Sequence, residues 1–167
     1  EAPVPVLQAA KAAGIPIRIG VNAGSLDSAL AERSDLTLPE KLVESATAYV
    51  EFCHGQGFYD VVVSAKAHDV PTTVATYRLL SQRMPEVPLH IGVTEAGTLF
   101  QGLIKSASGL GILLEQGIGD TMRISLTGDP TEEVRACWTL LSALGLRRRD
   151  PELVSCPTCG RCQVDLI

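Results

Sequence analysis

The feature that most constrains the fold of this chain is a fourfold alternation of short apolar stretches with amphipathic stretches. The apolar stretches are rich in Val and Ile and end at Gly or polar residues, which is typical of β-strands. They cover residues 16–24, 59–67, 88–97 and 121–128, and helical periodicity follows each over 39–55, 69–83, 100–117 and 129–145. Residues 6–14 resemble the end of an earlier helix. This order predicts an α/β fold of four βα units on a parallel sheet.

The two faces of the predicted strands favour one α/β architecture over another. The first strand has apolar residues on one face and polar or small residues on the other: Ile17, Ile19 and Val21 against Arg18, Gly20 and Asn22. The fourth strand has the same alternation. A doubly wound sheet, covered by helices on both sides, needs apolar residues on both faces. We therefore expect half of a TIM-type (βα)8 barrel, whose polar interior opens onto a ligand site.

Composition narrows the function classes. Hydrophobic residues make up 46% and charged residues 20%, which predicts a folded core rather than disorder. With 14 basic and 19 acidic residues, a non-specific nucleic-acid coat is not expected. No apolar run is long enough for a membrane span, and we see no signal peptide. Together with the five cysteines, this favours a reducing compartment, the cytoplasm or an organelle stroma.

Three cations are predicted near the carboxyl ends of the strands, where barrel enzymes place their sites. These are Arg18, Lys66 and Arg123. Unpaired buried charge is costly, so their convergence predicts a phosphate or diphosphate ligand, with Asn22 and Ser125 as hydrogen-bond donors. The alternative is that each cation pairs with a nearby carboxylate, such as Glu95 or Asp69.

Other polar and small residues near these strands carry weaker expectations. Glu95 could act as an acid or base, although strand parity puts it on the face opposite the polar one unless the loop turns it. His90 is expected to be a satisfied interior residue. Within 100–117 we expect Gly109 and Gly111 at close helix contacts and Gly117 at the helix end.

The end of the chain, SCPTCGRCQVDLI, contains Cys156, Cys159 and Cys162 in C-x2-C-x2-C spacing. A tight turn with Pro157 and Gly160 would direct the sulfurs toward one centre, as a zinc knuckle or an iron–sulfur site requires. Zinc normally takes four ligands, and this segment offers at most three. A linker from about Leu146 is expected to lead into this segment.

Several blocks, in order, together resemble the hydroxymethylbutenyl diphosphate synthase family: IPIRIGVNAGSL, SAKAHDV, LHIGVTEAG, IKSASGLGILLEQGIGDTMRISLTGDP and SCPTCGRCQVDLI. The resemblance implies a (βα)8 barrel followed by a small domain with a four-iron, four-sulfur cluster. It also implies a reductive reaction, in which two electrons open the ring of 2-C-methyl-D-erythritol 2,4-cyclodiphosphate and water is expelled. The product is 4-hydroxy-3-methylbut-2-enyl diphosphate, an isoprenoid precursor.

By motif, the resemblance implies a role for each matching residue. The diphosphate-binding residues are Arg18, Asn22, Lys66, Arg123 and Ser125. Glu95 matches an acidic residue near the substrate, and Cys156 and Cys159 match the first two cluster ligands. Cys162 does not match the family's ligand set.

The resemblance also implies that this chain is an internal fragment. Residues 1–145 would be the second half of the barrel, and 146–167 the linker and first cysteine motif of a truncated iron–sulfur domain. Ferredoxin or flavodoxin would supply electrons, in the cytoplasm or, in a photosynthetic eukaryote, the plastid stroma. Because a half-barrel exposes unpaired strands, we expect a homo-oligomer and an inactive fragment. Two other readings stay open: a zinc-knuckle binding module, and a phosphate-binding barrel with other chemistry, such as a pterin-using synthase.

Overall fold

The structure is a computed structural model that describes residues 3–149 and residue 151. Four strands are each followed by a long helix, which confirms the predicted α/β fold of four βα units. The strands are β1 (Ile17–Asn22), β2 (Val61–Lys66), β3 (His90–Gly92) and β4 (Thr121–Arg123). The helices that follow them are α3 (Leu38–Gly55), α4 (Val70–Arg83), α5 (Leu99–Glu115) and α6 (Pro130–Ala143), and α1 (Pro3–Ala13) precedes β1.

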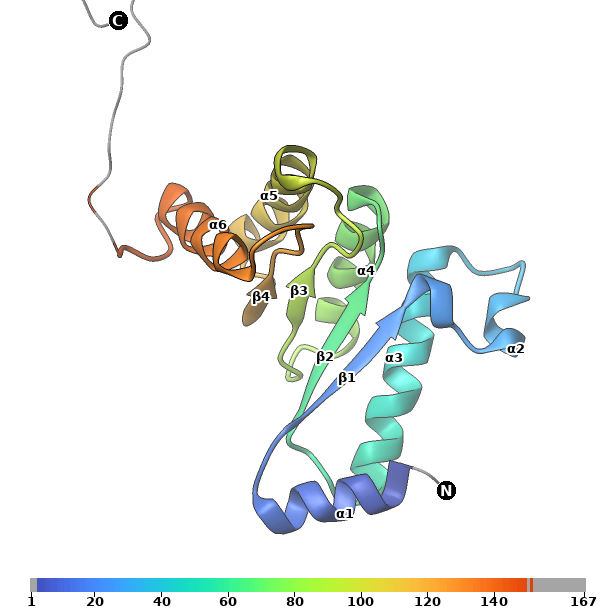
Figure 1. The fold of residues 1–167 in the computed structure, drawn as a ribbon. Coiled ribbons are helices and arrows are strands. Elements are labelled where there is room, and N and C mark those ends of the chain that lie inside the picture. The colour runs from blue at the N-terminus through green and yellow to red at the C-terminus, as the bar shows by residue number, and fades with distance from the viewer. Residues whose placement is uncertain (1–2, 150, 152–167) are drawn as a thin grey trace, which may run out of the picture.

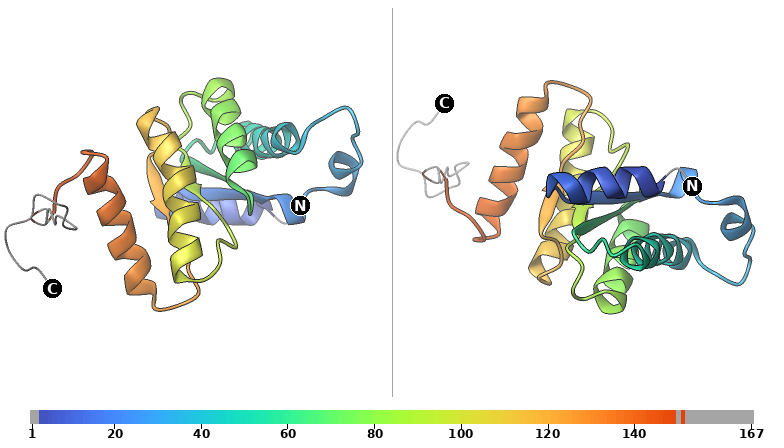
Figure 2. Two further views of the ribbon diagram at one scale, coloured as in Figure 1. Left: turned by 90° about the horizontal axis from the view of Figure 1, so that it is seen from above. Right: turned by 90° about the horizontal axis from the view of Figure 1, so that it is seen from below.

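The strands lie side by side in chain order and all run in the same direction. β1 pairs with β2, and β3 pairs with β4, both in parallel. A parallel bridge between Val63 and Leu89 joins the two pairs. Helices α3 and α6 flank the strands, with α4 and α5 behind them and α1 across their lower end (Figures 1 and 2). Helices on one side only fit part of a barrel.

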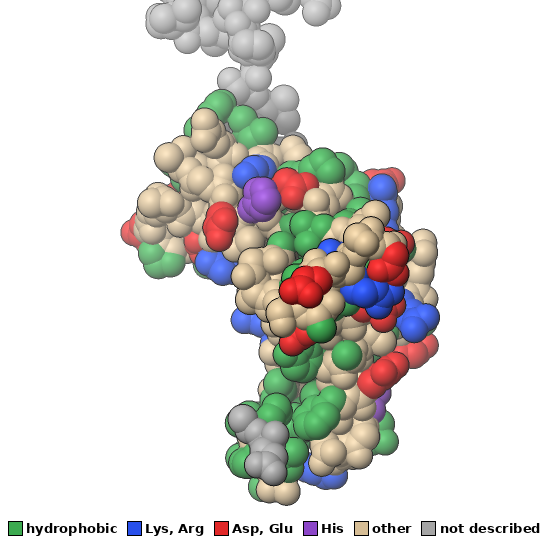
Figure 3. Space-filling model, turned by 90° about the vertical axis from the view of Figure 1, so that its right-hand side faces the viewer, with side chains coloured by type: hydrophobic (Ala, Val, Ile, Leu, Met, Phe, Trp, Pro, Cys, Tyr) green, Lys and Arg blue, Asp and Glu red, His purple; other side chains and the backbone are tan. Residues whose placement is uncertain are grey.

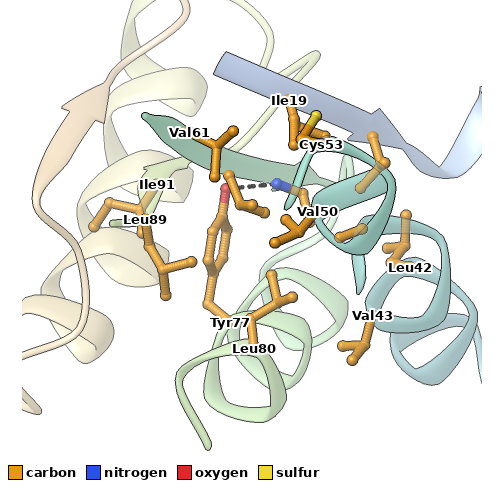
Figure 4. Close-up of a cluster of buried hydrophobic side chains, with 14 of the residues drawn as sticks. Ile19, Leu42, Val43, Val50, Cys53, Val61, Tyr77, Leu80, Leu89 and Ile91 are labelled. Carbon is orange, nitrogen blue, oxygen red and sulfur yellow. Dashed lines mark hydrogen bonds between the residues drawn. The ribbon is translucent and has the colours of Figure 1, made fainter. Parts of the chain in front are cut away.

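The hydrophobic core fills the space between the strands and these helices (Figure 4). Ile19 and Val21 of β1 face it, as do Val63 of β2 and Ile91 of β3. The helices contribute fully buried leucines: Leu42, Leu80, Leu110 and Leu113. The predicted apolar strand faces are therefore the faces that the helices cover, which leaves the polar faces on the other side of the sheet.

One helix side chain reaches into the backbone between β2 and β3. The hydroxyl group of Tyr77, on α4, accepts a hydrogen bond from the Ala65 amide at 3.1 Å (dashed line in Figure 4). The same hydroxyl group donates a hydrogen bond to the His90 carbonyl at 2.6 Å. Tyr77 is fully buried, and this burial raises the pKa of its hydroxyl to about 12. The tyrosine thus links the two strands where only a single bridge pairs them directly.

The helix boundaries follow local signals. Asp129, the first residue of the predicted helical stretch 129–145, caps α6 by accepting a hydrogen bond from the Thr131 amide at 2.8 Å, and Pro130 follows it in the first turn. Between β1 and α3 the chain forms two short elements that we did not predict, a 3₁₀ turn (Ala23–Ser25) and α2 (Ser28–Ala31). Asp27 caps α2 through the Ala29 amide.

The glycines of 100–117 match expectation at two positions of three. A Cβ atom at Gly109 would lie 3.1 Å from Val93, so the helix packs closely there. Gly117 has a φ of 72° just after α5 ends, as a helix terminus requires. At Gly111 nothing lies within 4 Å, so the expected close contact there is wrong. The α5 surface at Gly111 is simply open.

The surface is mixed in character. Viewed from the right-hand side of Figure 1, acidic and basic side chains are interspersed, and hydrophobic side chains gather toward the lower end (Figure 3). Val6, Phe52 and Tyr59 are among the exposed hydrophobic residues. Among the described helices, none combines the length and apolar character needed to cross a membrane.

Candidate anion-binding site

The polar faces of the four strands align in rows across the sheet. Asn22 pairs with Lys66 in the β1–β2 register, and Gly92 pairs with Arg123 in the β3–β4 register. Because Val63 pairs with Leu89, the next residues along place Lys66 beside Gly92. One row at the carboxyl ends of the strands therefore holds Asn22, Lys66, Gly92 and Arg123. Three of the predicted site residues thus come together, as expected for a barrel site.

Gly92 leaves room between the two cations of this row. A Cβ atom at this position would lie 3.3 Å from Cε of Lys66 and 3.7 Å from Cβ of Arg123. It would also lie 2.9 Å from the Arg123 carbonyl oxygen, closer than real Cβ atoms approach. The Lys66 side chain therefore lies over the backbone of β3, on the same face as Arg123. Only glycine fits here without a shift.

The remaining two predicted binding residues flank this row. Arg18 lies on the same face of β1 and its side chain is exposed, but it is near the start of the strand, four residues before Asn22, so its predicted place at the carboxyl end is wrong. Ser125 follows β4, and its hydroxyl accepts a hydrogen bond from Nη2 of Arg123 at 2.9 Å. Asn22 uses its side chain for no cap at the following 3₁₀ turn. The side-chain amide of Asn22 is therefore not used to cap this turn.

None of these three cations is neutralised by a carboxylate within the part of the chain that the structure describes. The ion pairs there are Arg33–Asp35 and Arg135–Glu132, both at the exposed exterior. The carboxylate of Asp69, one alternative partner, caps α4 by accepting from the Thr72 amide at 2.8 Å. The described residues therefore do not show the alternative arrangement, in which each cation would pair with a nearby carboxylate.

Burial and like charges act together on Lys66. Burial lowers the pKa of its ammonium group to about 8, and the positive charges of Arg123 and Arg18 contribute. Both effects penalise the charged form. An anion bound among the three cations would reverse the second effect. The site is thus electrostatically poised for a negatively charged ligand.

His90 lies on the same face, one row below Gly92. It is 6% exposed, and its Nδ1 is 2.8 Å from Oγ1 of Thr121. Its Nε2 is buried, and no partner for it exists among the described residues. Burial lowers the His90 pKa to about 4, with Lys66, Arg18 and Arg123 adding to the shift. The expectation of a satisfied interior histidine is correct for one ring nitrogen and wrong for the other.

Glu95 follows β3 in a loop with unusual backbone geometry. Its φ is 52°, the one positive value at a non-glycine position in the described residues. The loop is tied down by the Thr94 amide, which donates to the Ala67 carbonyl at 3.1 Å. Because β3 ends at Gly92, the alternation of faces along the strand does not extend to Glu95, which lies in the loop that follows. Glu95 is exposed and makes no ion pair with the described cations. Backbone strain of this kind is frequent at functional sites.

The predicted metal ligands Cys156 and Cys159, and also Cys162, lie outside the described residues. Among the residues that are described, no group of His, Cys, Asp or Glu side chains could hold a metal ion. Cys53 is buried and Cys137 half-buried, and burial raises the pKa of both thiols. Cys53 is therefore a residue of the hydrophobic core.

Comparison with known proteins gives consistent matches. The GcpE TIM-barrel domain family matches residues 2–138. The chain is 57% identical over 162 residues to the 4-hydroxy-3-methylbut-2-en-1-yl diphosphate synthase (flavodoxin) of Geobacter sulfurreducens, covering 97% of this chain and 46% of that protein. Identity to the enzyme of the same name from Lawsonia intracellularis is 52% over 164 residues, with 98% and 45% covered. For Brevibacillus brevis it is 46% over 162 residues, with 97% and 45% covered. The chain spans about half the length of the curated relatives it matches.

Proposed function

Because the chain belongs to the family of the GcpE TIM-barrel domain, we propose that it forms half of the substrate-binding barrel of a reductive synthase. The full-length enzyme would convert 2-C-methyl-D-erythritol 2,4-cyclodiphosphate to 4-hydroxy-3-methylbut-2-enyl diphosphate, with two electrons consumed and water expelled. The names of the relatives at 46–57% identity support this activity. The chain alone, half of the barrel, would be inactive.

The observation that carries the proposal is the convergence of three cations on one face of the sheet, with no carboxylate partner among the described residues. Lys66 and Arg123, on either side of Gly92, would bind the phosphoryl oxygens. Arg18 would add a third positive charge on the same face. Ser125 already accepts from Arg123, so it would fix the guanidinium and offer its own O–H to the ligand. Asn22 would donate from its amide. Charge-assisted bonds of this kind are the strong ones.

The protein residues near the reacting end of the substrate would act on protons and orientation. Glu95, exposed at the carboxyl edge of the sheet, would serve as the acid or base. A four-iron, four-sulfur cluster would supply the two electrons when bound. Cys156 and Cys159 would be its first two ligands, and we do not assign Cys162 to it. The cluster's further ligands would come from elsewhere in the full-length protein.

The remaining parts of the proposal concern the setting of the reaction. Flavodoxin is the electron donor given in the names of the relatives, and we propose it over ferredoxin for this protein. A cytoplasmic location is supported by the bacterial origin of these relatives. We also propose self-association of the half-barrel. We propose neither nucleic acid nor a membrane as a partner of this protein.

The test uses a full-length protein that carries these residues, purified anaerobically with iron and sulfide. We expect a broad visible absorption, and conversion of the cyclodiphosphate when reduced flavodoxin is added. Stoichiometric zinc without that absorption would overturn the proposal in favour of a zinc-knuckle module. Iron without turnover or binding of the cyclodiphosphate would favour a barrel of other chemistry.

A further inference from the structure

His90 is surrounded by positive charge on every strand packed against it. Its own element, β3, presents no charged group on the polar face. The groups that face it are Arg18 on β1, Ser64 and Lys66 on β2, and Thr121 and Arg123 on β4. From the opposite side, Tyr77 bonds the His90 backbone carbonyl and stays protonated. No carboxylate contributes to the environment that depresses the His90 pKa.

The ring nitrogens of His90 have different roles in this setting. A neutral imidazole carries one N–H and one lone pair, and the hydrogen bond at one nitrogen fixes the other. A lone pair at Nε2 faces neighbouring cations favourably, whereas an N–H there would be repelled. This assigns the N–H to Nδ1, which then donates to Oγ1 of Thr121 at 2.8 Å. The buried Nε2 is left as an acceptor without a partner among the described residues.

We propose that His90 takes up a proton when the diphosphate binds. Without a ligand, burial and the three cations together keep the ring neutral. The negative charges of a bound diphosphate cancel their field, and Nε2 accepts one proton from solvent. The resulting N–H donates a hydrogen bond to a phosphoryl oxygen and gives Nε2 its missing partner. This inference rests on the proposed function, because it uses the same site and ligand.

The size of the effect is sufficient for a measurable change. At an effective dielectric constant of about 20, a unit charge roughly 6 Å away moves a pKa by roughly two units. Without a ligand the pKa of His90 is about 4, against an ordinary value of 6.5. A bound diphosphate would cancel the cations' field and, through the hydrogen bond to Nε2, would offset the penalty of burial, so the pKa of His90 would rise toward its ordinary range. Binding at mildly acidic pH then becomes coupled to proton uptake.

The experiment is titration calorimetry of the full-length protein with the cyclodiphosphate at about pH 5.5. Repeating it in buffers of different ionisation enthalpy gives the number of protons taken up. Each phosphoryl group of this cyclic ligand has a single strongly acidic proton, so the ligand itself does not titrate there. Lys66, with a pKa of about 8, is already protonated and contributes nothing.

We expect uptake of most of one proton in the wild type and almost none in His90→Gln. His54→Gln and His68→Gln change the other two histidines of the chain and serve as matched controls that retain the uptake. Absence of binding in the wild type would count against the proposed function itself. Binding without uptake, or uptake that persists in His90→Gln, would overturn only the role of His90.

A second readout covers the case in which His90→Gln does not fold. The ¹⁵N chemical shift of Nε2 in the wild-type protein should move from the lone-pair range to the protonated range when the ligand is added. A merely structural histidine would keep its shift. An unchanged Nε2 signal at saturating ligand would therefore overturn the inference without any variant.

Discussion

The side chain of Lys66 lies against Gly92, so that a Cβ atom at Gly92 would be 3.3 Å from the Lys66 Cε atom. Because Gly92 has no side chain, the Lys66 side chain can lie over the backbone of β3, on the same face as Arg123. A glycine in a short, fully buried strand is otherwise unfavourable. Its presence is explained by this close approach, which brings two cations together on one face of the sheet.

Gly92→Ala should therefore weaken binding of the cyclodiphosphate by about tenfold or more. The added methyl group meets Lys66 and, at 2.9 Å, the Arg123 carbonyl, so the lysine must move aside. We expect a loss of roughly 1–3 kcal/mol in stability from overpacking. Calorimetric titration and urea unfolding measure the two effects.

The matched control for this change is Gly111→Ala in α5. Nothing lies within 4 Å of that position, so the methyl group should be accommodated and should stabilise the helix by about 0.5–1 kcal/mol. Ligand affinity should stay the same. If Gly92→Ala bound the ligand as tightly as Gly111→Ala, the space left by Gly92 would not be needed to place Lys66 for binding.

Lys66 should oppose the stability of the empty protein while serving the ligand. Its pKa in the folded protein, about 8, is below the ordinary value of 10.5. Between these values the unfolded chain binds more protons, so the free energy of unfolding should rise with pH across this window. Below about 8 the penalty from charged Lys66 is fully present. Ligand affinity should change in the opposite direction and fall as pH rises through 8, because the cation is lost.

Lys66→Met separates these two consequences. At neutral pH it should raise the free energy of unfolding in the absence of ligand and greatly weaken cyclodiphosphate binding. Lys41→Met, on the exterior helix α3, is the control and should do neither. Urea unfolding at neutral and alkaline pH measures the first effect. A variant less stable than the wild type at neutral pH would show that Lys66 is not electrostatically penalised.

Tyr77→Phe should destabilise the sheet where β2 meets β3. It removes the hydroxyl that accepts from the Ala65 amide and donates to the His90 carbonyl, leaving both buried backbone groups without that partner. We expect a loss of about 1–3 kcal/mol in the free energy of unfolding. Amide hydrogen exchange at Ala65 should also become faster. Tyr49→Phe, at a tyrosine that is 53% exposed, should change stability by less than about 0.5 kcal/mol. Equal effects would contradict the bridging role.

This chain, expressed alone, should self-associate. In the described residues, β1 pairs only with β2 and β4 only with β3, so each has an unpaired outer edge. Beside β4, a hollow of about 280 Å³ is lined by Val134, Cys137 and Trp138, and α6 buries none of its residues. A second copy would cover these surfaces. Light scattering that shows a monodisperse monomer would exclude this.

The sequence predicted those features that depend on local pattern. The alternation of Ile19 and Val21 with Arg18 and Asn22 identified the two sheet faces, because period two holds along a strand. Asp129 marked the start of α6 through ordinary capping chemistry. The placement of Lys66 and Arg123 in one row followed from the rule that parallel strands end at one edge, whereas Arg18 lies near the start of β1.

Other features depend on contacts between distant residues and carry no local signal. The left-handed backbone at Glu95 is imposed by the loop around it, since glutamate itself disfavours that conformation. The role of Tyr77 needs β2, β3 and α4 in place together. The open Nε2 of His90 is visible only when every neighbour is known. The strand pattern showed that His90 faces inward and could not show which of its nitrogens lacks a partner.

The most direct measurement of the central claim is the affinity of Arg123→Ala for 2-C-methyl-D-erythritol 2,4-cyclodiphosphate in the full-length protein. Arg123 lies beside Gly92 and bonds Ser125, so its removal takes away one cation and frees the serine. Arg135→Ala removes the same charge from the exposed face of α6. We predict a loss of about 2–3 kcal/mol, or roughly 30- to 150-fold, for Arg123→Ala and none for Arg135→Ala. Unchanged affinity in Arg123→Ala would contradict a diphosphate site on this face of the barrel.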